Sequence, residues 1–154
     1  MATLAADDGR CGVTTHNGDG SCRRPEIEVA VPATSAYLSV VRTAAAALAA
    51  RLDFTLDDIE DLRMAVDEAC SILLTQVVEG SQLKCSFYID GATMTVSARA
   101  HAPTPRPPSR DGFAWMVLTA LTSSVDVEVV SGDGDTDHEL VISLTHSGAR
   151  VDSP

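Results

Sequence analysis

Two hairpin patterns in the second half of the chain limit the folds that it can adopt. Residues 83–90 and 93–101 have strand-like composition and flank Asp90-Gly91, a dipeptide that favours a tight β-hairpin turn. Residues 125–130 and 138–144 form a second pair around an acidic, glycine-containing turn at 132–135. Because strands joined by hairpins pair antiparallel, we predict a mixed, mostly antiparallel sheet.

Three segments have helical patterning. One apolar stripe, with steps of three and four, runs along residues 34–52, and another runs along residues 55–80. Thr34 or Ser35 can cap the first of these helices. Thr55 and Asp58 resemble a capping box at the start of the second segment. A short helix is expected at 113–121, and residues 26–31 alternate like a strand that Pro32 ends. The predicted fold is α+β, a two-layer sandwich with its helices on one face of the sheet.

The predicted domain covers residues 25–146. Residues 1–24 are turn-rich without an apolar period, so we expect a disordered tail, and residues 147–154 are expected to fray. Residues 101–110 contain four prolines, which predict an extended loop between the first hairpin and the last helix.

Composition and net charge narrow the classes of function that this chain can have. The chain has 154 residues and a net charge of −11, a sign that repels nucleic acids and anionic lipids and suits a basic protein partner. No stretch approaches the roughly 20 apolar residues of a membrane span, and no secretion signal is recognisable, so we expect a cytoplasmic location. Cys70 and Cys85 lie in apolar stretches and are expected in the core. Cys11 and Cys22 lie in the tail, where a thiol switch of partner binding is a further hypothesis.

Three stretches of the chain resemble one family. They are residues 62–71 (LRMAVDEACS), residues 111–121 (DGFAWMVLTAL) leading into 125–127, and residues 133–136 (DGDT). In this order they resemble the anti-sigma factor and serine-protein-kinase family of the GHKL ATPase superfamily, across about residues 26–146. The resemblance implies a histidine-kinase-like ATPase fold. It is greatest to actinobacterial members that regulate stress and sporulation sigma factors.

The resemblance implies a nucleotide site, which this sequence alters. Glu68 would be the catalytic base, but Ile72 stands where the family has an asparagine ligand for magnesium. Residues 101–105 contain no Asp or Gly in place of the family's Asp-x-Gly-x-Gly turn. By resemblance, Asp111, Gly112 and Thr136 are the remaining nucleotide-binding candidates. We therefore expect no cofactor and no metal site, unless the chain is an active kinase, which would need ATP and magnesium.

The resemblance also implies partner-binding residues on the first helix. Arg42 would form an ion pair across the interface, with Tyr37 and Leu38 nearby, although a lone solvated Arg42 is an equal alternative. Trp115 is expected either to anchor an interface or to lie at the edge of the core. The family is typically dimeric, so a homodimer is expected.

Two functions follow as hypotheses. The first is an anti-sigma factor that sequesters an alternative sigma factor and is released by an anti-anti-sigma antagonist. The second is an active ATP-dependent serine kinase that phosphorylates this antagonist. Glu68 favours the kinase, and Ile72 opposes it because its side chain offers no lone pair to a metal ion.

Overall fold

The computed structural model describes residues 23–134 and 137–148. Nearly all of the predicted N-terminal tail, with Cys11 and Cys22, lies outside these residues. So do Thr136 and the predicted tail from residue 149 onward.

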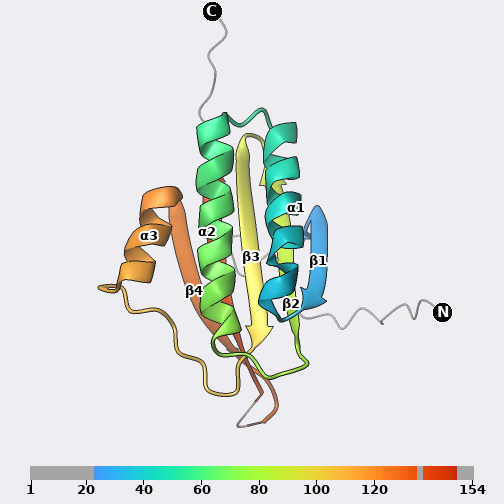
Figure 1. Ribbon diagram of the computed structural model, residues 1–154, viewed down its shortest axis with the longest axis vertical. Coiled ribbons are helices and arrows are strands. Elements are labelled where there is room, and N and C mark those ends of the chain that lie inside the picture. The colour runs from blue at the N-terminus through green and yellow to red at the C-terminus, as the bar shows by residue number, and fades with distance from the viewer. Residues whose placement is uncertain (1–22, 135–136, 149–154) are drawn as a thin grey trace, which may run out of the picture.

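The described chain is an α+β sandwich of the predicted element order. Its strands are β1 (Ile27–Pro32), β2 (Gln82–Asp90), β3 (Thr93–His101), β4 (Ser124–Ser131) and β5 (His138–Ser147). Its helices are the 3-10 turn η1 (Ser35–Tyr37), α1 (Leu38–Arg51), α2 (Leu56–Leu74) and α3 (Phe113–Leu121). The sheet has the order β1-β2-β3-β5-β4, and all its strand pairs are antiparallel. The helices lie on one side of it, with α2 between α1 and α3 (Figure 1).

The core lies between the sheet and the helices. Alternate residues of β2, β3 and β5 point into it, as the two-residue period of a strand requires. Phe87 is the largest fully buried side chain, and Cys70 and Cys85 are buried as predicted. Contact with the Cys85 side chain, together with burial, raises the pKa of the Cys70 thiol well above its usual value. Both cysteines therefore serve as small apolar core residues.

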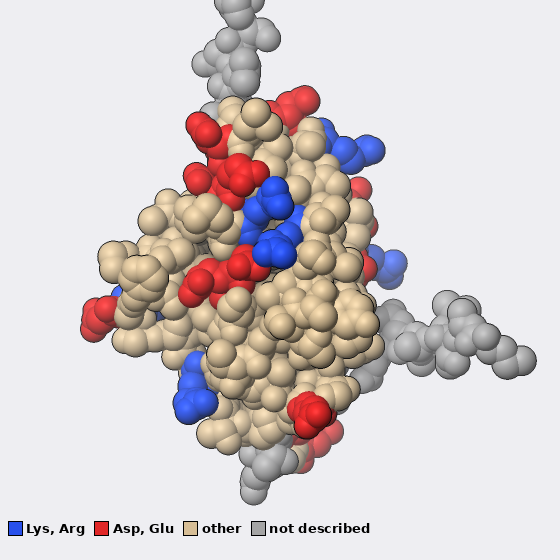
Figure 2. Space-filling view, viewed as in Figure 1, with Lys and Arg blue, Asp and Glu red and all other residues tan. Residues whose placement is uncertain are grey.

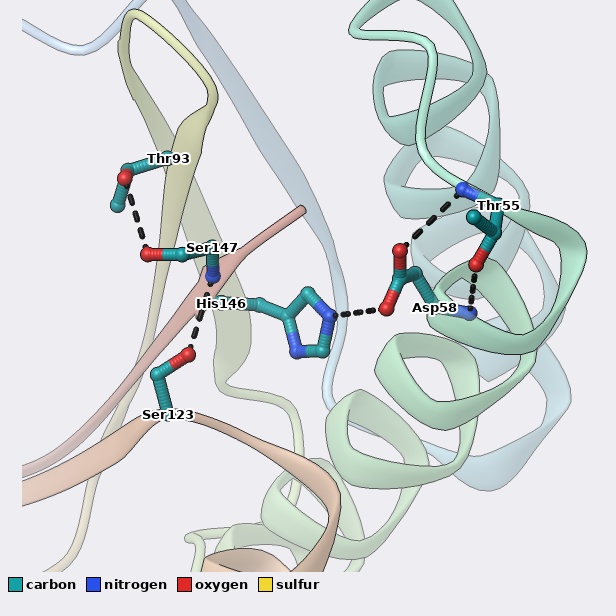
Figure 3. Close-up of polar contacts among 6 residues, drawn as sticks. All are labelled: Thr55, Asp58, Thr93, Ser123, His146 and Ser147. Carbon is teal, nitrogen blue, oxygen red and sulfur yellow. Dashed lines mark hydrogen bonds and ion pairs between the residues drawn. The ribbon is translucent and has the colours of Figure 1, made fainter. Parts of the chain in front are cut away.

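The start of α2 is fixed by local and distant contacts. The predicted capping box is present, since Thr55 Oγ1 accepts the Asp58 N–H at 3.1 Å and Asp58 Oδ2 accepts the Thr55 N–H at 3.3 Å. Asp58 Oδ1 also lies 3.1 Å from Nε2 of His146, a buried residue of β5 (Figure 3). The His146 ring packs on Phe54, with ring centroids 5.6 Å apart. Asp58 thus joins the first turn of α2 to the last strand.

The first helical segment begins after Thr34, which is its N-cap residue as predicted, although it opens as a 3-10 turn and Thr34 makes no side-chain capping bond. Two other predicted boundaries are wrong. The second helical segment ends at Leu74 instead of residue 80, with Thr75 as its C-cap residue. Ser147, predicted in the frayed tail, belongs to β5, since it pairs with Thr93 of β3, and its N–H also donates to Ser123 Oγ at 3.1 Å (Figure 3).

No described helix combines the length and the apolar character that crossing a membrane requires.

Candidate functional site

The candidate nucleotide site lies on the side of α2 that faces away from α1. Arg42 of α1 contacts Asp67 of α2 at 3.1 Å, which marks the side of α2 next to α1. Residues 68 and 72 lie about 100–140° around the helix from Asp67, on the side where α3 packs (Figure 1). Glu68 and Ile72 are both half-buried there, one turn apart on the same face.

These residues do not fit a magnesium–nucleotide complex. Magnesium needs oxygen ligands in near-octahedral geometry, and the Ile72 side chain is a hydrocarbon that supplies none. In the described parts of the chain, no three His, Cys, Asp or Glu side chains group as metal ligands. Glu68 lies on the same helical face as Ile72, and its role as a catalytic base stays a prediction.

The loop between β3 and α3 is tied to Gln76, which follows the C-terminal end of α2. Gln76 follows Glu68 and Ile72 in steps of four, and its side-chain amide pairs with the backbone of Arg106 in both directions. Gln76 Nε2 donates to the Arg106 carbonyl at 2.9 Å, and the Arg106 N–H donates to Gln76 Oε1 at 2.6 Å. The proline-rich segment is extended, as predicted, and Gln76 holds it in place. Sequence reasoning missed Gln76, because no local pattern marks a contact across 30 residues.

Gln76→Ala is expected to raise the hydrogen-exchange rate of the Arg106 amide about thirtyfold, because it removes two hydrogen bonds worth about 1 kcal/mol each. Exchange followed by NMR would measure this. Gln82→Ala, at an exposed position that begins β2, is the control and should leave the Arg106 amide unchanged. Equal exchange in Gln76→Ala and wild type would mean that the prolines alone fix the loop.

The N-terminus of α3 carries the other nucleotide-binding candidates. Gly112 is the N-cap residue, and a Cβ there would lie 3.1 Å from the Ser109 carbonyl oxygen, so the close approach favours glycine. Asp111 is exposed, and Thr136 is not described. Trp115 is half-buried, and the Arg110 guanidinium lies 4.6 Å from its ring centroid in a cation–π contact.

The predicted partner-binding residues separate into two groups. Tyr37 is 43% exposed, and Arg42 is half-buried in its ion pair with Asp67, so it is not the lone solvated arginine of the alternative reading. Leu38 is only 7% exposed and packs in the core, which corrects its assignment to the partner surface. Asp67 was not predicted, because its contact with Arg42 spans 25 residues.

A hollow of about 280 Å³ lies elsewhere, against the face of the sheet that bears no helices. Lys84, Arg99, His101 and Glu139 are among its lining residues. Its basic groups already have acidic neighbours, for example Glu28 at 3.6 Å from Lys84. The hollow is lined by residues between 80 and 101 and by Glu139, so it is separate from Glu68 and Ile72 of α2.

Sequence comparison finds relatives with two kinds of name. Over 68 residues the chain is 43% identical to the serine-protein kinase RsbW of Halalkalibacterium halodurans, covering 43% of this chain and 42% of that protein. Over 99 residues it is 31% identical to the anti-sigma-F factor RsbW of Mycobacterium tuberculosis, covering 64% of this chain and 59% of that protein. The chain thus spans about half the length of these curated relatives. No family model matches it.

Structural comparison finds the same fold in a solved protein. The crystal structure of the RsbU and RsbW domains of Rv1364c from Mycobacterium tuberculosis matches with a TM-score of 0.54 and 18% identity. The match covers 83% of this chain and 34% of that one. At this identity the match concerns the fold alone.

Proposed function

We propose that this chain, which is RsbW-like in sequence and fold, is an anti-sigma factor that binds and sequesters an alternative sigma factor. An anti-anti-sigma protein would release the sigma factor by competing for the chain, which would act in the cytoplasm as a homodimer. The observation that carries the proposal is Ile72, an aliphatic residue on the helical face that bears Glu68. Without an oxygen ligand for magnesium at residue 72, a chain of this kind would regulate by protein contact.

Arg42 and Tyr37 are the proposed partner contacts. Both belong to the start of the first helical segment, and each retains exposed side-chain surface. The Arg42–Asp67 pair holds the guanidinium in place between α1 and α2, which reduces the side-chain entropy lost when a partner carboxylate binds it. The net charge of −11 would speed the approach of a basic partner surface.

The test combines capture with a comparison of Arg42 and Asp67 variants. The tagged chain is used to capture a sigma factor from the native host, and the affinity for the purified sigma factor is then measured by calorimetry. Arg42→Ala is expected to weaken binding at least tenfold, about 1.4 kcal/mol. Asp67→Ala breaks the same intrachain pair but keeps the guanidinium, so it should change binding less than threefold. Arg51→Ala, at the other end of α1, should leave it unchanged.

Two results would contradict the proposal. If no sigma factor is captured, the anti-sigma function is wrong. If Arg42→Ala and Asp67→Ala weaken binding equally, Arg42 acts only by supporting the α1–α2 contact. The intrachain pair is partly exposed and contributes at most about 1 kcal/mol to stability, so both variants should remain folded.

A second candidate function is a serine kinase acting on the anti-anti-sigma protein with ATP and magnesium. The retained Glu68 and the name of the relative from Halalkalibacterium halodurans support it. Titration of the chain with ATP and magnesium is expected to give no detectable heat at millimolar nucleotide. Micromolar binding, with phosphate transfer to the antagonist that Glu68→Ala abolishes, would establish the kinase instead.

A further inference from the structure

Helix α3 exposes apolar side chains on the side where most surface helices carry polar residues. Its nine residues, FAWMVLTAL, include no charged residue, yet only Leu118 is fully buried. Phe113 is 75% exposed, Met116 is 60% exposed, and Ala120 is also exposed. These three residues follow the spacing i, i+3 and i+7, which aligns them along one side of the helix. Exposed apolar surface of this kind marks interaction sites in soluble domains.

The side of α2 beside α3 continues this surface and adds negative charge. Met64 of α2 is 56% exposed. Asp61 and Glu68 are placed one helical turn before and one after it, and Asp111 precedes α3. Figure 2 shows that the surface over α3 carries few charges, whereas acidic groups lie along α2 beside it. The basic neighbour Arg110 is engaged with the Trp115 ring.

We propose that α3 and the adjoining side of α2, here the α3 surface, form a docking site for a basic amphipathic helix of a partner protein. The partner's apolar side would cover Phe113, Met116 and Met64, and its Lys or Arg residues would meet Asp61, Glu68 and Asp111. A nine-residue helix is about 13 Å long, so two to three turns of a partner helix would cover it. Helix-in-groove docking commonly uses such paired apolar stripes.

Charge selects this occupant over two others. An anionic membrane would be repelled by the flanking carboxylates and by the net charge of −11. A second copy of the chain, docked through the same surface about a two-fold axis, would bring like acidic residues together. A basic amphipathic helix could cover the apolar residues at the centre of the α3 surface and pair with the carboxylates at its edge.

The α3 surface is distinct from the proposed sigma-factor surface. Arg42 and Tyr37 belong to the first helical segment, and α2 separates α1 from α3 (Figure 1). The inference does not rest on the anti-sigma function, and Arg42→Ala should leave binding at the α3 surface unchanged.

The test uses a fluorescent synthetic peptide of about 14 residues, built from Leu and Lys in helical amphipathic order. The double variant Phe113→Ser/Met116→Gln is expected to bind it at least tenfold more weakly than wild type. The control is Leu56→Ser, which removes a side chain that is 82% exposed beside Asp57 and Asp58 but away from α3. It should bind within twofold of wild type. Circular dichroism would verify that all variants are folded.

Charge variants test separately the contribution of the carboxylates at the edge of the α3 surface. Asp61→Lys should weaken peptide binding at least threefold, and Asp126→Lys, an equal change at an exposed position of β4, should change it less than twofold. Binding should also weaken as salt rises, since the ion pairs are exposed.

Three results would overturn the proposal. The first is equal peptide affinity of Phe113→Ser/Met116→Gln and wild type. The second is binding to phosphatidylglycerol vesicles that the double variant abolishes, which would assign the surface to a membrane. The third is self-association in sedimentation experiments that the same variant abolishes, which would assign it to a second copy of the chain.

Discussion

Replacing Phe87 by alanine is expected to lower the free energy of unfolding by about 3–5 kcal/mol, because the substitution leaves a cavity in addition to the lost burial. Phe87 is 0% exposed and lies on β2, where its side chain points between the sheet and the helices. Aromatic residues make up only 4% of the chain, so few neighbouring rings can fill the space left by its loss. Urea unfolding followed by circular dichroism would measure the change.

Phe113→Ala is the matched control for this experiment. It makes the same chemical change at a side chain that is 75% exposed, so stability should change by no more than about 0.5 kcal/mol. If Phe87→Ala cost less than about 1 kcal/mol, the core around β2 would have to collapse onto the cavity, contrary to the close packing expected of a protein interior.

Sequence predicts the elements whose signals are local. The turn between β2 and β3 was predictable because Asp90-Gly91 carries it, and Gly91 has the positive φ of 58° that such a turn requires. The start of α2 was predictable because Thr55 and Asp58 are three residues apart and cap the helix themselves. In both cases the residues that determine the structure lie close together in the sequence.

The features that sequence missed depend on distant contacts. The end of α2 was predicted at residue 80, but the helix ends at Leu74, and beyond it the Gln76 side chain bonds the backbone of Arg106. Leu38 follows the same helical period as its core neighbours, so the periodicity predicted its burial better than the family resemblance predicted its contact with a partner. Asp67 and His146 gave no signal, because their partners Arg42 and Asp58 lie 25 and 88 residues away in sequence.

The candidate nucleotide site also combines features that the sequence predicts with features that only the structure shows. The spacing of Glu68 and Ile72 on one helical face was readable from the sequence, as was the absence of an oxygen atom from the Ile72 side chain. The hydrogen bonds by which Gln76 holds the loop could not be predicted from the sequence. Neither could the exposure of Phe113 and Met116 on α3. An uncharged helix is usually buried, so only the fold could reveal that one side of α3 faces solvent.

Asp58→Ala is expected to lower the free energy of unfolding by about 2–3 kcal/mol, through two losses. The first is half of the capping box, the bond from the Thr55 N–H to Asp58 Oδ2. The second is the contact with His146 Nε2, whose side chain is 9% exposed (Figure 3). Water cannot readily replace the carboxylate there, and His146 Nδ1 already has no hydrogen-bond partner among the described residues. Guanidinium unfolding would measure the change.

Three variants separate these two losses. Asp57→Ala removes an exposed carboxylate from the same helical turn and should change stability by no more than about 0.5 kcal/mol. Thr55→Ala removes the other half of the capping box but keeps Asp58 for His146, so a loss of about 1 kcal/mol is expected. Asp58→Asn retains an oxygen acceptor and should recover part of the stability lost in Asp58→Ala. Equal stability of Asp58→Ala and Thr55→Ala would show that His146 contributes nothing, and that capping alone fixes the first turn of α2.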